Sequence, residues 1–148
     1  MLFVVAGASV FVWVITYAEL PQKFTELFIS LAQNRYIVLL LINVILFIVG
    51  MFIDTVSAII IFTPLLLPAV QKFGIDEIHF GIIMMVNLAI GMCTPPFAVC
   101  LYVACGISKT KISDLLHDLS YMIPALVIVL LIITYFPETF MFLTRLIK

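Results

Sequence analysis

The sequence predicts an all-α polytopic membrane protein, and two observations lead to that fold class. Hydrophobic residues make up 66% of the 148 residues, charged residues make up 10%, and the mean hydropathy is +1.36. Soluble domains are about half apolar and a quarter charged, so this composition is typical of an integral membrane protein. The apolar runs are also continuous, as in IVLLLINVILFIVG, whereas the strands of a membrane barrel would alternate.

The first two elements are predicted as a span and a connector. Residues 1–18 are apolar and just long enough for a transmembrane helix across a core of about 30 Å. Residues 19–36 place Lys23 and Glu26 between apolar residues at helical spacing, which predicts an amphipathic connecting helix with Pro21 in its first turn. This helix either lies in the membrane interface or is a plain connector, and the pattern leaves both open.

Residues 37–70 are apolar but too long for one ordinary span of about 20 residues. Polar and small residues gather near the middle of this segment: Gly50, Asp54, Thr55 and Ser57. Two arrangements fit such a pattern. Either the segment is a re-entrant helical hairpin with its tip at the polar break, or one tilted helix runs on into a second.

Residues 77–108 predict a discontinuous transmembrane helix. Asp76 is a good N-cap for its start. Further along, Gly91, Pro95 and Pro96 interrupt the apolar pattern, because proline lacks an N–H group and clashes with the preceding turn. The apolar pattern then resumes, which indicates two half-helices.

The last predicted span covers residues 119–136 and follows SKTKISDLLHDLS, a polar loop with amphipathic character in which Ser108 or Ser113 could cap a helix. His79 and His117 fall in polar segments, where we expect solvated or capping histidines. The pattern shows no linker, so residues 1–148 are expected to form a single membrane domain.

Two polar breaks in apolar segments indicate a binding site near the middle of the bilayer. Half-helix ends attract ions, and paired interruptions are the best sequence indication of a transporter site. Asp54 is the only carboxylate within a predicted membrane segment, where a charge costs at least about 2.5 kcal/mol. A partner elsewhere in the fold, a bound cation or protonation would each offset that cost, and Asp54 would also serve as the N-cap of a helix starting at Thr55.

Oxygen ligands suit a hard cation, and Thr55, Ser57 and the carbonyls around Gly50 would add to the Asp54 carboxylate. If the helix is regular, Asn43, Phe47, Gly50 and Asp54 share one face, and Asn87, Gly91 and Pro95 share another. Asn43 and Asn87 either line a transport pathway or simply form hydrogen bonds across helices.

Several other classes of function find no support in the sequence. The net charge of −1 gives no indication of a nucleic-acid partner. No Ser-His-Asp arrangement is placed near an apolar pocket, and an intramembrane aspartyl protease would need two facing aspartates. The three cysteines have no partners at metal-ligand spacing. We therefore expect neither an enzyme nor a bound cofactor.

Four motifs in this order resemble one family: GMFID, TPLLLP, FGID and GMCTPP. From about Leu39 to Ala104 the chain is similar to the C-terminal half of the large membrane subunit of TRAP transporters, the DctM type. The resemblance implies one repeat of an inverted-repeat, elevator-type transporter in the bacterial inner membrane. That family's large subunit holds two such repeats, so the resemblance also implies a truncated or split product that lacks the N-terminal half.

The resemblance further implies Na⁺-coupled import of organic acids such as C4-dicarboxylates or sialic acid. Na⁺ is then the coupling ion, and the partners are a periplasmic substrate-binding protein, a small TRAP membrane subunit, the N-terminal half of the large subunit, a carboxylate substrate and the lipid bilayer. Carried over by motif, the Na⁺ sites are Gly50, Asp54, Thr55, Gly91, Thr94 and Pro95. The substrate pathway is Asn43, Ser57, Asn87 and Pro96.

Two rival functions remain open on the sequence. One is another ion-coupled carboxylate carrier with the same broken-helix design, which would transport without a binding protein. The other is a non-transporting membrane fragment of such a carrier.

Overall fold

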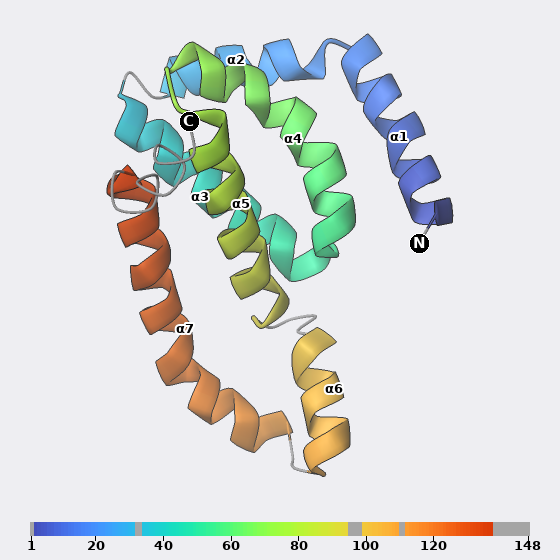
Figure 1. The fold of residues 1–148 in the computed structure, drawn as a ribbon, viewed down its shortest axis with the longest axis vertical. Helices are drawn as coiled ribbons and strands as arrows, with labels where there is room; N and C mark the ends of the chain where they lie inside the picture. The colour runs from blue at the N-terminus through green and yellow to red at the C-terminus, as the bar shows by residue number, and fades with distance from the viewer. Residues whose placement is uncertain (1, 32–33, 95–98, 110–111, 138–148) are drawn as a thin grey trace, which may run out of the picture.

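The computed structural model describes residues 2–31, 34–94, 99–109 and 112–137, and the regular structure within those ranges is helical (Figure 1). The predicted all-α class is therefore confirmed. The helices are α1 (Leu2–Tyr17), α2 (Leu20–Leu31), α3 (Arg35–Phe52), α4 (Thr55–Lys72), α5 (Glu77–Met92), α6 (Val99–Ser108) and α7 (Ile112–Tyr135). Among the described residues, α3 and α4 are the helices long and apolar enough to cross a membrane by length and composition.

The long apolar segment is divided into α3 and α4 at its polar centre. Ile53 and Asp54 have extended backbone conformations, with φ of −118° and −65°. The Ile53 N–H still donates to the Val49 carbonyl at 2.9 Å, so α3 closes its last turn before the chain changes direction. Figure 1 shows α3 running down the view to this break and α4 returning upward from it.

The two arms of this hairpin pack mainly on other helices. α3 makes its most extensive contacts with α5, whereas α4 packs against α1, α2 and α5. Ile42 and Leu46 of α3, Leu66 of α4, and Ile83 and Leu88 of α5 are fully buried in one core. Since α5 touches both arms and also α7, it is the central helix of the described fold.

α5 has a well-formed beginning and an abrupt end. Asp76 caps it, since its Oδ1 accepts hydrogen bonds from the backbone N–H groups of Ile78 at 2.8 Å and His79 at 3.4 Å. The helix ends at Met92, and α6 begins at Val99. The predicted discontinuity therefore has a helix on each side, while Pro95 and Pro96 lie outside the described residues.

α7 begins at Ile112, within the amphipathic segment that precedes the predicted span of residues 119–136. This segment is helical because apolar residues recur through ISDLLHDL at helical spacing. Pro124 lies inside the same helix, which continues to Tyr135.

Candidate functional site

The two polar breaks lie side by side, where the end of α3 meets the end of α5. Gly50 of α3 and Gly91 of α5 form the contact, and both are buried. A Cβ atom placed on Gly91 would lie 2.7 Å from the carbonyl carbon of Gly50 and 2.8 Å from its Cα. Side chains at this crossing would force the helices apart, so glycine is what lets the two backbones touch.

A side-chain hydrogen bond joins the same two breaks. Thr55 is the first residue of α4, Met92 is the last residue of α5, and both are half-buried. The Thr55 hydroxyl donates to Met92 Sδ with 2.7 Å between the oxygen and the sulfur. The start of α4 is thereby tied to the end of α5.

Asp54 caps α4, as the sequence predicts for a helix starting at Thr55. Its Oδ2 accepts a hydrogen bond from the Ser57 backbone N–H at 3.0 Å. The carboxylate is exposed in this chain and lies in the two-residue break after Phe52. The expectation that Asp54 continues the α3 face of Asn43 and Gly50 is wrong, because α3 has already ended.

The residues that follow α5 turn back onto its last carbonyls. Thr94 is buried, its hydroxyl donates to the Ile90 carbonyl at 2.8 Å, and its N–H donates to the Gly91 carbonyl at 2.9 Å. The Thr94 hydroxyl oxygen keeps lone pairs that can accept or coordinate. Pro95 and Pro96 complete the predicted set but lie outside the described residues.

The electrostatics of this junction fit a small cation. The C-terminal ends of α3 and α5 meet at Gly50 and Gly91 and each carry partial negative charge, and Asp54 follows α3 two residues after its end. The side-chain oxygens of Asp54 and Thr55 are hard donors of the type that Na⁺ prefers over sulfur or nitrogen. The N-terminal end of α4 points a partial positive charge at the same place, which favours a carboxylate next to the cation.

The two buried asparagines bond to each other instead of facing open space. Asn87 Nδ2 donates to the Asn43 carbonyl at 2.9 Å and to Asn43 Oδ1 at 2.8 Å. Asn43 Nδ2 in turn donates to Leu39 O at 2.9 Å and to Thr134 Oγ1 at 3.0 Å. The chain of hydrogen bonds joins α3, α5 and α7, which matches the cross-helix interpretation of these amides.

His79 is a buried residue that the sequence interpretation missed. Its side chain is fully buried, and Nε2 lies 2.9 Å from the carbonyl oxygen of Ile133 in α7. The sequence does carry a signal for this position, because His79, Ile83, Asn87 and Gly91 are four residues apart and share one face of α5. The side chain of His117 lies outside the described set.

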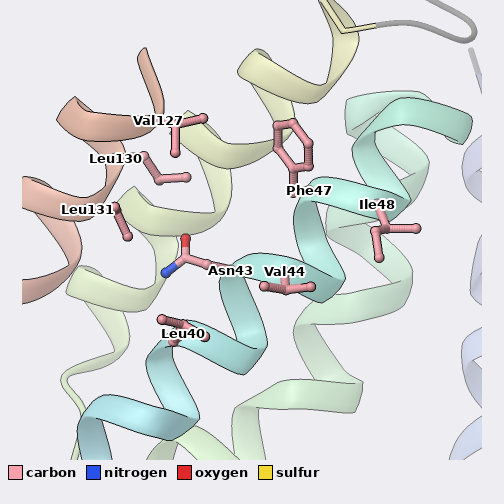
Figure 2. Close-up of a pocket in the computed structure, with 8 residues that line it drawn as sticks. All are labelled: Leu40, Asn43, Val44, Phe47, Ile48, Val127, Leu130 and Leu131. Atoms are coloured by element: carbon pink, nitrogen blue, oxygen red, sulfur yellow. The ribbon is translucent and has the colours of Figure 1, made fainter. Parts of the chain in front are cut away.

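An apolar groove of about 280 Å³ lies between α3 and α7, away from the two breaks (Figure 2). Its lining residues are Leu40, Asn43, Val44, Phe47, Ile48, Val127, Leu130 and Leu131. Asn43 is the polar member, and its amide is already used within the fold. The groove therefore lacks groups that would recognise a carboxylate, and the junction of the breaks is the better candidate site.

Comparison with known proteins relates the chain as a whole to a family of transporters. A family model described as "Tripartite ATP-independent periplasmic transporter, DctM component" matches residues 1–139. The chain is 46% identical to the uncharacterized protein YgiK of Salmonella typhimurium, over 85% of this chain and 29% of that protein.

Two further relatives have names that state a substrate. The isethionate TRAP transporter permease protein DctMQ of Oleidesulfovibrio alaskensis is 44% identical over 91% of this chain and 21% of its own length. The sialic acid TRAP transporter large permease protein SiaM of Vibrio cholerae is 34% identical over 90% of this chain and 31% of its own length. The chain thus spans less than a third of the length of each of these relatives.

Proposed function

Because the chain belongs to the DctM component family of tripartite ATP-independent periplasmic transporters, we propose that it is part of the permease of a Na⁺-coupled organic-acid importer. The observation that carries this proposal is the junction of the two breaks, where Gly50 touches Gly91 and Thr55 bonds Met92. Interrupted helices that meet inside an apolar fold are typical of transporter ion sites. The relatives named for isethionate and sialic acid support an organic anion as the substrate.

In this proposal the junction binds the transported Na⁺. The Asp54 carboxylate, the Thr55 hydroxyl and the Gly50 carbonyl supply oxygens from the α3–α4 side. On the side of α5, the oxygens come from Gly91, Thr94 and Pro95. The partial negative charges at the ends of α3 and α5 favour the same ion.

The substrate carboxylate lies next to the ion, near Ser57 at the start of α4 and near Pro96. The N-terminal end of α4 favours that anion. We assign Asn43 and Asn87 a different role from direct substrate contact. Since they are buried and bonded across α3, α5 and α7, they hold these helices together as one moving unit.

The membrane arrangement follows from the same assignment. α3 and α4 form a re-entrant hairpin with its tip at Asp54, and α5 and α6 form one discontinuous helix. The unit moves across the bacterial inner membrane as an elevator. Its partners are the remainder of the large subunit, a small membrane subunit and a periplasmic substrate-binding protein.

Replacing Asp54 by asparagine tests the ion site. Asparagine keeps the N-cap but removes the charge, so α4 still forms while the cation loses its anionic ligand. In proteoliposomes that hold the complete transporter, we expect Asp54→Asn to lower uptake driven by a Na⁺ gradient by at least about 10-fold.

Asp76→Asn is the matched control, because Asp76 caps α5 in the same way and lies away from the junction. This control should transport normally. Na⁺-driven uptake that survives in Asp54→Asn at the wild-type rate would remove Asp54 from the ion site.

A further inference from the structure

We propose that Met92 is a positioning residue for the coupling ion, and that it orients the Thr55 hydroxyl so that the oxygen lone pairs face Na⁺. This inference rests on the proposed function, because it deepens the assignment of Thr55 to the ion site. The observation behind it is the hydrogen bond from the Thr55 hydroxyl to Met92 Sδ, at 2.7 Å.

A hydroxyl group carries one proton and two lone pairs, and only the lone pairs can coordinate a cation. A threonine that serves an ion must therefore direct its proton elsewhere. Met92 Sδ accepts a hydrogen bond from the Thr55 hydroxyl proton, so the lone pairs of the hydroxyl oxygen stay available for the ion.

The position of Thr55 explains why it needs an acceptor from another helix. Thr16, Thr25, Thr94 and Thr134 each donate to the carbonyl four residues earlier, all at 2.8 Å. Thr55 is the first residue of α4, and the residue four positions before it belongs to α3. The usual acceptor within the same helix is thus missing for Thr55, and α5 provides the sulfur instead.

The contact of Gly50 with Gly91 brings the backbone of Met92 close to the break between α3 and α4. The two backbones approach as closely as glycine permits, directly before Met92. A thioether accepts hydrogen bonds weakly and is a poor ligand for a hard ion. Met92 therefore orients Thr55 without itself competing for Na⁺.

The chain contains a matched pair elsewhere between the same two helices. The Thr63 hydroxyl of α4 lies 3.5 Å from Met84 Sδ of α5, nearer the middle of both helices. Both methionines thus accept a hydrogen bond from a threonine across the interface of α4 and α5, but of the two only Met92 lies at the junction of the breaks. Met84 is consequently the control position for loss of a thioether acceptor.

The test replaces each methionine by leucine, which has a similar volume and no acceptor. In the complete transporter, Met92→Leu should raise the Na⁺ concentration for half-maximal uptake by about 2- to 10-fold, the range that one hydrogen bond contributes. The maximal rate should stay near the wild-type value. Met84→Leu should leave the Na⁺ dependence unchanged.

A binding readout and a double variant separate positioning from packing. The binding readout is the rise in Tm of the purified complete transporter as Na⁺ is added. In Met92→Leu, the Na⁺ concentration that gives half of this rise should increase by the same factor. In a Thr55→Val background, where no hydroxyl proton remains, Met92→Leu should have no further effect on either quantity. An equal effect of Met92→Leu with and without the hydroxyl would overturn the positioning role, as would unchanged Na⁺ dependence in the single variant.

Asp54→Asn distinguishes failure of this inference from failure of the proposed function. If Asp54→Asn abolishes Na⁺ dependence and Met92→Leu is neutral, the ion site stands and the role of Met92 falls. If neither variant alters the response to Na⁺, both proposals fall together.

Discussion

Among the glycines of the described fold, Gly91 has the least space for a side chain. The backbone of Gly50 lies where any side chain would go, whereas a Cβ on Gly81, in the same helix, would meet nothing within 4 Å. The two glycines of α5 are therefore under different constraints, although the sequence alone presents them in similar apolar surroundings. Only the packing of α3 on α5 tells them apart.

This difference gives a test of the helix contact. We expect Gly91→Ala to lower the free energy of unfolding of the chain in detergent micelles by about 1–3 kcal/mol, since the added carbon must push the backbones apart. Gly81→Ala should be neutral or stabilising by up to about 1 kcal/mol, because alanine favours the helix. Equal effects in denaturant unfolding would show that the close crossing is absent.

Local rules predicted several individual residues well. Asp54 and Asp76 both cap helices in the structure, and the N-cap preference of aspartate is a property of the chain within a few residues. His79 was mispredicted because its neighbours Asp76 and Glu77 suggested a solvated segment. Its burial depends on α7, which lies far away in the sequence.

At the scale of elements, the break between α3 and α4 was predictable because the polar residues gather there. The pairing of two polar breaks indicated a shared site, but helical periodicity does not say which helices touch, so the contact of Gly50 with Gly91 could not be predicted. The amphipathic segment before residue 119 is the first part of α7, and its polar face is typical of a helix that continues beyond an apolar span.

The asparagine bridge between elements can be tested by a double-variant cycle. Asn87→Leu leaves Asn43 Oδ1 without its donor and removes the extra hydrogen bond to the Asn43 carbonyl, so we expect a loss of about 0.6–1.7 kcal/mol in unfolding free energy. The double variant Asn43→Leu/Asn87→Leu should lose less than the sum of the two single variants, since no unpaired amide remains on either helix. Strict additivity would mean that the two amides do not interact.

At the scale of the whole molecule, the chain exposes large apolar side chains on most of its helices. Tyr17 and Ile107 are each 80% exposed, and Trp13 is 67% exposed. Exposed apolar area of this extent marks a surface that meets lipid or other helices. Such a surface agrees with membership of a permease family. The relatives compared are more than three times as long as the part of them that this chain matches.

The proposed assembly predicts a dependence on a soluble partner. Uptake into proteoliposomes should require the cognate periplasmic binding protein, because in the proposed assembly that protein delivers the substrate to the permease. The measurement compares Na⁺-driven uptake with and without the binding protein at equal substrate concentration. Uptake at the same rate in its absence would favour an ordinary ion-coupled carboxylate carrier.

The central claim is that the junction of the α3–α4 break with the end of α5 binds Na⁺, and a Na⁺ titration of thermal stability tests it most directly. An ion that binds only the folded state stabilises it by about 2.7 kcal/mol at one hundred times its Kd. We predict that Na⁺, but not choline, raises the Tm of the complete transporter, and that Asp54→Asn loses this response while Asp76→Asn keeps it. A Na⁺-dependent rise in Tm that is the same in Asp54→Asn as in the wild type would contradict the account.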